Sequence, residues 1–125
     1  MTVQMVRTWA QTIRVHRDTA SAYDDLHARV WPEVLNALRD VGVIDMRIFR
    51  SGERLFMFMT TVDGFNPDVD FARHLKMSPK CEEWSALTRT FQKPSEDAKD
   101  GEWWTYMDEV FDLQAQLKAI DESGE

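Results

Sequence analysis

The chain has 125 residues, of which 43% are hydrophobic and 30% charged, and its formal net charge is −7 at pH 7. This length predicts one domain, residues 1–125, that is large enough for a single core. The negative charge argues against nucleic acid and against a membrane surface as partners, because both attract clusters of lysine and arginine. A neutral or cationic small molecule, or another protein chain, is the expected partner.

The N-terminal segment lacks the pattern of a signal peptide. The longest nearly uncharged apolar run, residues 55–61, is too short to cross a bilayer. The single cysteine, Cys81, excludes an internal disulfide and a cysteine-based metal cluster. We therefore expect a cytoplasmic protein.

The first predicted element is a strand over residues 6–15, where apolar and polar residues alternate imperfectly. A helix is expected over residues 20–39, because apolar residues recur there at helical spacing, and Asp18 or Thr19 is placed to cap it. Pro32 lies inside this helix. Since proline removes a backbone hydrogen bond, we expect a kink or a break there.

Two apolar runs, 43–50 and 54–62, are joined by a short glycine-containing turn and predict a β-hairpin. A second helix is expected over 71–91, interrupted at a Ser-Pro step, and then a loop over 92–102. The last predicted strand covers 107–113, ahead of a charged tail that frays. The order β-α-β-β-α-β is that of the ferredoxin-like α+β fold, a four-stranded antiparallel sheet with helices on one face.

A sheet with helices on one face leaves its other face uncovered. In a chain of this size, packing that face against a second copy is the least costly way to bury it. We therefore expect a homodimer.

Tyr23, His27 and Trp31 follow one another in steps of four, so the three rings lie near one stripe of the predicted helix. Aromatic residues at this spacing usually pack on a sheet, and a lone histidine often satisfies a core hydrogen bond. Histidine also takes and gives a proton near neutral pH, and a tyrosine one turn away can donate or orient a hydrogen bond. Such a pair, with indoles nearby, suits a sugar, whose CH face stacks on tryptophan.

Trp84, Trp103 and Trp104 lie in otherwise polar stretches, where each indole either anchors the core or stacks on a ligand. The three histidines lie on different predicted elements, so they form a metal site only if the fold brings them together. Adjacent acidic pairs, such as Asp24–Asp25, resemble glycosidase carboxylates, but neighbouring acids on a helix usually form a solvated face.

Several segments resemble those of the L-rhamnose mutarotase family, in the same order along the chain. The matching segments are Tyr23-x-x-x-His27 with Trp31-Pro32-Glu33, "DMRIFR" (45–50), "LFMFMTTV" (55–62), "KCEEWSAL" (80–87) and "MDEVFDL" (107–113). The resemblance covers roughly residues 5–113, which we expect to be the core of the domain, and leaves 114–125 as a tail.

The resemblance implies a dimeric α+β barrel of ferredoxin-like chains that interconverts the α and β anomers of a 6-deoxyhexose. The active-site tyrosine and histidine of the family fall on Tyr23 and His27. The first residue of its paired-tryptophan motif falls on Trp84, and the second is Ser85 here. The "GEWW" segment with Trp103 and Trp104 resembles family members of L-fucose catabolism, so L-fucose and L-rhamnose are both candidate substrates.

The expected mechanism opens the hemiacetal, rotates the aldehyde and recloses the ring on the other face. His27 is the expected general acid or base, with Tyr23 as its partner or orienter. The expected sugar contacts are Trp84, Trp103, Trp104 and Trp31, and neither a cofactor nor a metal is required. Two alternatives stay open: a cofactor-free monooxygenase or haem-degrading enzyme of the same fold, and a non-catalytic binding module.

Overall fold

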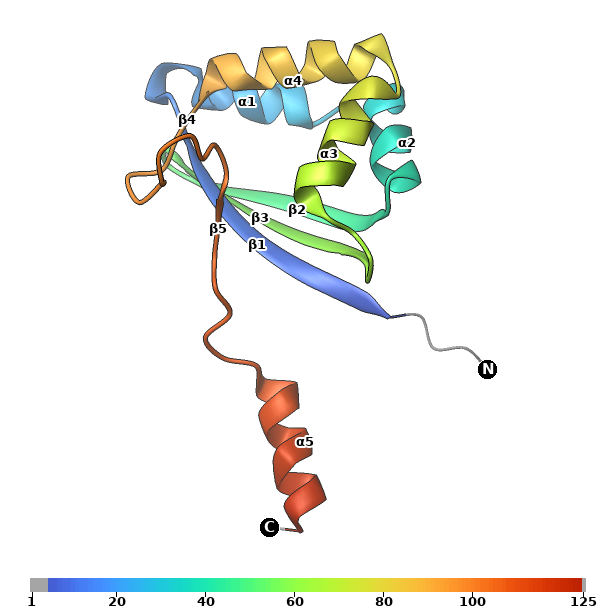
Figure 1. The fold of residues 1–125 in the computed structure, drawn as a ribbon. Helices are drawn as coiled ribbons and strands as arrows, with labels where there is room; N and C mark the ends of the chain where they lie inside the picture. The colour runs from blue at the N-terminus through green and yellow to red at the C-terminus, as the bar shows by residue number, and fades with distance from the viewer. Residues whose placement is uncertain (1–4, 125) are drawn as a thin grey trace.

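The computed structural model describes residues 5–124 as a layer of helices on one face of a curled antiparallel sheet (Figure 1). The elements, in order, are β1 (Val6–Val15), a 3₁₀ turn (Arg17–Thr19), α1 (Ala20–His27), α2 (Pro32–Asp40), β2 (Val43–Ser51), β3 (Arg54–Val62), α3 (Pro67–Lys76), α4 (Pro79–Phe91), β4 (Gln92–Lys93), β5 (Thr105–Tyr106) and α5 (Leu113–Ser123). This is the predicted ferredoxin-like α+β architecture.

The sheet is centred on β1. One edge of β1 pairs along its whole length with β3, which in turn pairs with β2. Its other edge pairs first with β5 at Gln11 and Thr12, and then with β4 at Arg14 and Val15. The fourth position of the predicted sheet is therefore filled by two short strands, which bring both ends of the intervening loop onto β1.

The predicted strand over 6–15, the hairpin and the interruption at the Ser-Pro step are confirmed. The break near Pro32 is also confirmed, because α1 ends at His27 and α2 begins at Pro32. Proline is tolerated at the first position of a helix, where no backbone partner exists for an N–H group. The prediction that Trp31 shares a helical stripe with Tyr23 and His27 was wrong, because Trp31 is the extended N-cap residue of α2.

The predicted side-chain cap of α1 was also wrong. Thr19 occupies the N-cap position, but its side chain makes no capping hydrogen bond, and its hydroxyl lies 3.3 Å from the carbonyl of His16. A hydroxyl that donates back to the preceding 3₁₀ turn is not placed to accept from the helix.

The predicted last strand over 107–113 was wrong as well. The chain pairs with β1 through Thr105 and Tyr106. One further hydrogen bond runs from Met107 N–H to the carbonyl of Ala10 at 2.8 Å, and the chain then leaves the sheet (Figure 1). Polar and apolar residues come in pairs over 108–111 instead of alternating, so a strand there has no continuous apolar face.

The C-terminal tail forms a regular helix, contrary to the expectation of fraying. The carboxylate of Asp112 accepts a hydrogen bond from Ala115 N–H at 3.0 Å, and Gly124 ends α5 with φ 75°. Figure 1 shows α5 pointing away from the helical layer and the sheet. None of the helices described is long and apolar enough to cross a membrane.

The core lies between the sheet and the helices. Ile13 and Leu55, both fully buried, pack with Tyr23 in one cluster, whereas Trp84 belongs to a second cluster between α2 and α4. A third cluster, around Met59, fills the space under α3. The first two clusters place α1 and α4 against each other above one end of the sheet.

Gly42 connects α2 to β2 in a conformation that other residues rarely adopt, with φ 110°. A Cβ at this position would lie 2.8 Å from Cγ2 of Val62, whose branched side chain has little rotamer freedom. We expect Gly42→Ala to lower the free energy of unfolding by about 2 kcal/mol, from strain and overlap together. Urea denaturation followed by tryptophan fluorescence measures this loss.

The matched control is Gly52→Ala in the hairpin turn. Gly52 also has positive φ, 60°, but no atom lies within 4 Å of its added Cβ, so only the conformational cost of about 1 kcal/mol is expected. Equal losses for the two variants would refute the steric role of Val62.

Candidate active site

Tyr23 and His27 lie one helical turn apart at the C-terminal end of α1. Their rings stack with centroids 4.0 Å apart and planes inclined by 28°. Nδ1 of His27 lies 2.9 Å from the backbone carbonyl of Tyr23. Since a carbonyl only accepts, Nδ1 carries the proton and donates it, which leaves Nε2 of the neutral ring with a free lone pair.

A cleft of about 230 Å³ runs between α1 and the hairpin, and both rings line it. Its walls are Tyr23, Asp24, His27 and Ala28 of α1, with Ile48, Arg50 and Leu55 of β2 and β3. A second cleft, of about 360 Å³, adjoins it across Arg50 near the hairpin turn.

An ion pair joins the two walls of the cleft. Nε of Arg50 donates to Oδ1 of Asp24 at 2.8 Å, and Nη2 donates to Oδ2, so the pair is bidentate. The Arg50 guanidinium lowers the pKa of the Asp24 carboxyl below its usual value. Sequence reasoning missed Arg50, because the two partners lie 26 residues apart and no local pattern connects them.

Burial determines the protonation of both rings. It lowers the pKa of His27 below its ordinary value of 6.5, against the smaller opposing effects of the Tyr23 carbonyl and the Asp24 charge. It raises the pKa of Tyr23 to about 12, although the hydrogen bond from Gln92 acts in the opposite direction. At neutral pH the site therefore holds a neutral imidazole beside a protonated phenol.

Trp84 and Trp31 extend the aromatic contacts beyond His27. The Trp84 ring on α4 lies edge-on to His27 with centroids 5.2 Å apart, and edge-on to Trp31 at the same distance. The ammonium of Lys80 lies 5.3 Å from the Trp31 ring. Trp31 therefore supports Trp84. None of the predicted sugar-contacting tryptophans, Trp31, Trp84, Trp103 and Trp104, is among the residues that line the cleft.

Trp103 and Trp104 come from the loop between β4 and β5, and both pack against the cluster that contains Tyr23. Nε1 of Trp103 donates to Oε1 of Gln92 at 2.8 Å, and Nε2 of Gln92 donates to the Tyr23 hydroxyl at 3.3 Å. Gln92 was missed by the sequence analysis, since a single glutamine in an expected loop carries no signal.

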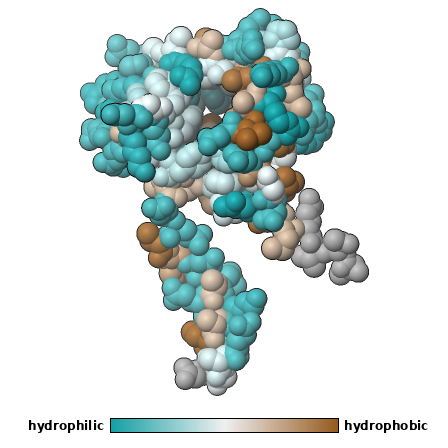
Figure 2. All heavy atoms as spheres, in the orientation of Figure 1, coloured by the Kyte–Doolittle hydropathy of each residue, from teal (hydrophilic) through white to brown (hydrophobic). Residues whose placement is uncertain are grey.

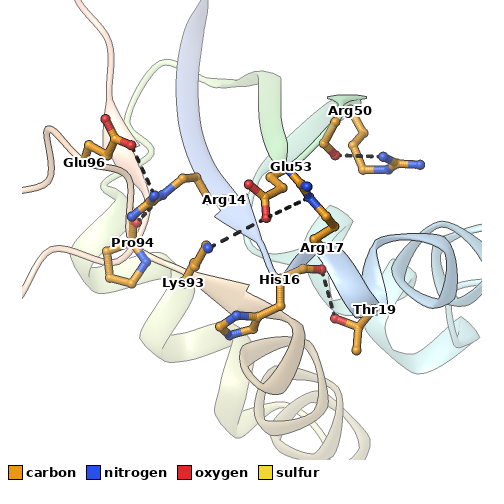
Figure 3. A network of polar contacts seen from close by, with 10 residues as sticks. Arg14, His16, Arg17, Thr19, Arg50, Glu53, Lys93, Pro94 and Glu96 are labelled. Atoms are coloured by element: carbon orange, nitrogen blue, oxygen red, sulfur yellow. Dashed lines mark hydrogen bonds and ion pairs between the residues drawn. The ribbon is translucent and has the colours of Figure 1, made fainter.

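A polar network beside the cleft holds β4 in place (Figure 3). Glu53 of the hairpin turn lies 3.8 Å from Arg17 and 3.9 Å from Lys93 of β4. Arg14 donates to the carbonyl of Pro94 at 2.9 Å. These contacts tie the residues that flank Gln92 to β1 and to the hairpin.

The other two histidines lie away from the cleft. His16 is exposed next to the 3₁₀ turn, and the buried ring of His74 contacts the carbonyl of Val34 through Nε2 at 3.3 Å. Over residues 5–124, no three histidine, cysteine or acidic side chains gather closely enough to hold a metal ion.

Comparison with known proteins gives matches over most of the chain. The family model described as L-rhamnose mutarotase matches residues 8–113. A UPF0734 protein of Dictyostelium discoideum is 37% identical over 112 residues, which cover 86% of this chain and 90% of that protein. The L-fucose mutarotase of Xanthomonas campestris pv. campestris is 36% identical over 103 residues, which cover 79% of this chain and 82% of that protein.

Solved structures share the fold. The L-rhamnose mutarotase of Formosa agariphila matches with a TM-score of 0.64 at 23% identity, over 86% of this chain and 98% of that chain. SnoaB, a cofactor-independent oxygenase from Streptomyces nogalater, matches with a TM-score of 0.52 at 15% identity, over 86% of this chain and 95% of that chain. At these identities the likeness shows the fold alone.

The hydrogen bond and burial of His27 predict its titration. We expect a neutral ring with the proton on Nδ1 at pH 7, and a titration midpoint below pH 6.5, because burial disfavours the imidazolium. Two-bond ¹H–¹⁵N correlation spectra across a pH series distinguish the tautomers and give the midpoint. A proton on Nε2, or a midpoint above 6.5, would contradict this arrangement.

Proposed function

Because this chain belongs to the L-rhamnose mutarotase family, we propose that Tyr23 and His27 interconvert the α and β anomers of a 6-deoxyhexose in the cleft beside them. The observation that carries the assignment is the pairing of a free Nε2 with a protonated phenol on one helical turn. Mutarotation needs one group that accepts a proton and another that donates one, and this pair supplies both.

His27 is the general base in the opening direction. Its Nε2 takes the proton of the anomeric hydroxyl, and the neutral ring is ready to do so because burial disfavours the imidazolium. The nearby charge of Asp24 stabilises the imidazolium once it forms. A positioned base of this kind typically accelerates a reaction by about 10² to 10⁴-fold.

Tyr23 is the general acid in the same step. As the bond between C1 and the ring oxygen breaks, that oxygen becomes an alkoxide, which is a stronger base than a phenolate and takes the Tyr23 proton. After rotation about C1–C2, the freed hydroxyl attacks the other face of the aldehyde and gives its proton to the Tyr23 phenolate. His27 returns its proton to the carbonyl oxygen, which becomes the new anomeric hydroxyl. Both residues end as they began, so the cycle needs no cofactor.

The sugar would lie in a cleft smaller than those that hold drug-sized ligands, which suits a monosaccharide. We propose that Trp84, Trp103 and Trp104 provide the aromatic surface for its CH face, with Trp31 holding Trp84 from behind. L-fucose and L-rhamnose are the candidate substrates, and the cytoplasm is the expected place of action.

Saturation-transfer NMR at the anomeric protons of L-fucose and L-rhamnose tests the activity. We expect the wild-type chain to accelerate exchange between the anomers of at least one sugar. His27→Ala should lose about 10² to 10⁴-fold of the acceleration, because it lacks the base while keeping the cleft. The sugar with the faster exchange is the preferred substrate.

No acceleration with either sugar, from a chain whose spectrum shows it folded, would refute the mutarotase assignment. The alternative of a cofactor-free monooxygenase or haem-degrading enzyme has only fold-level support. Oxygen uptake, or a Soret band after incubation with haem, would then favour it.

We propose further that the chain works as a homodimer formed through the sheet face opposite the helices. On this face Phe49 and Phe56 stack with centroids 6.2 Å apart, and Phe49 and Phe58 are 56% and 41% exposed. The segment between β5 and α5 also exposes Val110 and Phe111, and Figure 2 shows apolar residues along it. Packing against a second copy would bury both surfaces.

Light scattering coupled to size-exclusion chromatography tests the dimer. We expect a mass of twice the 14.6 kDa chain for the wild type and a single-chain mass for Phe58→Asp, because the new carboxylate would be buried at the centre of the interface. The control is Val69→Asp on α3, in the helical layer on the opposite side. Val69 is also an exposed apolar residue, and this variant should stay dimeric. A monomeric wild-type chain would rule out the dimer.

A further inference from the structure

Three side chains from distant parts of the chain form a line of hydrogen bonds that ends at Tyr23. The indole N–H of Trp103 donates to the amide oxygen of Gln92 at 2.8 Å. The amide nitrogen of Gln92 donates to the Tyr23 hydroxyl at 3.3 Å. Gln92 is 6% exposed, so solvent does not compete for its amide group.

The chemistry of these groups gives the line a direction. An indole nitrogen donates and never accepts, so the end of the Gln92 amide that faces Trp103 is its oxygen. The amide nitrogen must then face Tyr23, and the phenol oxygen is the acceptor of that bond. The proton of the Tyr23 hydroxyl is left free to point elsewhere. Tyr23 is 2% exposed and is one of the residues that line the cleft.

We propose that Trp103 and Gln92 are positioning residues that hold the Tyr23 hydroxyl proton toward the cleft, ready for the ring oxygen of the sugar. This inference rests on the proposed mutarotase function and adds Gln92 to the residues that serve it. It also gives the Trp103 nitrogen a task separate from stacking. Without Trp103, the Gln92 amide can rotate by half a turn and accept the Tyr23 proton itself.

The surroundings hold both residues in place. Gln92 pairs with Val15 at the end of β1, and His16 N–H donates to the carbonyl of Phe91 at 2.9 Å. The contacts of Figure 3 hold the adjoining Lys93 and Pro94. On the other side of the line, the guanidinium of Arg89 lies 4.8 Å from the Trp103 ring and occupies one of its faces.

A double-mutant cycle tests the line, using Trp103→Phe, Gln92→Met and the pair together. If both residues act through one chain of hydrogen bonds, each single variant lowers kcat by about tenfold with little change in KM, and the double variant is no slower than the slower single variant. If Trp103 only stacks on the sugar, KM rises and the two losses multiply, and the inference is overturned.

Gln92→Glu tests the orientation of the Tyr23 hydroxyl proton separately from the hydrogen bond with Trp103. A carboxylate still accepts from Trp103, but it also accepts from Tyr23 and turns the phenol proton away from the cleft. We expect its kcat to fall at least as far as that of Gln92→Met. An unchanged kcat in Gln92→Glu would overturn the inference. This variant keeps the hydrogen bond from Trp103 but reverses the direction of the hydrogen bond between residue 92 and Tyr23.

Trp9→Phe is the matched control for the indole substitution. Nε1 of Trp9 donates to the Thr61 hydroxyl at 2.9 Å, and its ring packs on Phe65 in the cluster away from the cleft. It loses the same N–H group and the same ring volume as Trp103→Phe, so its kcat should stay within about twofold of wild type. An equal fall in both variants would mean that the loss reflects general destabilisation, and would overturn the inference.

An NMR measurement of the Trp103 indole proton separates this inference from the proposed function. In Gln92→Met the resonance should move upfield and exchange faster with solvent, whether or not the chain has activity. An unchanged resonance overturns the inference even in an active enzyme. A wild-type chain without mutarotase activity overturns the proposed function, and with it the role of the line, even if the resonance moves.

Discussion

The break in the chain ahead of Pro32 is the constraint from which the site follows. Proline cannot continue a helix from within, so α1 ends at His27 and the chain crosses to α2 in an extended conformation. His27 therefore stands in the last turn, where a histidine can donate to a backbone carbonyl. It donates to the carbonyl of Tyr23 through Nδ1, so a local backbone restriction determines which nitrogen faces outward.

Burial then shifts the pKa values of the two rings in opposite directions. Desolvation disfavours whichever form of a group is charged, so it keeps the imidazole deprotonated and the phenol protonated. The polar partners of the two rings, a backbone carbonyl and the Gln92 amide, orient them without adding a charge. The Asp24 carboxylate beside them is held by the Arg50 guanidinium at the wall of the cleft.

Local patterns in the sequence predicted most of the fold and the contact between Tyr23 and His27. Alternation predicted β1, and two apolar runs joined by a glycine-containing turn predicted the hairpin. Pro32 predicted the helix break, and the spacing of Tyr23 and His27 predicted their contact. Gln92 and Arg50 escaped prediction because their bonds span 69 and 26 residues and depend on strand register. The strand predicted over 107–113 does not form, because its apolar residues have no surface of the same chain to pack against.

The loop between β4 and β5 has a consequence for how such an enzyme can change over evolution. The proposed reacting pair, Tyr23 and His27, lies within five consecutive positions of α1. Trp103 and Trp104 reach the same cluster from a separate loop, which is anchored at each end by a two-residue strand. Insertions and deletions in that loop leave α1 untouched, so the surroundings of the proposed sugar site can change while Tyr23 and His27 are inherited unchanged. The product of a duplicated gene could change its sugar specificity in this way, provided that the loop still places an indole N–H within reach of Gln92.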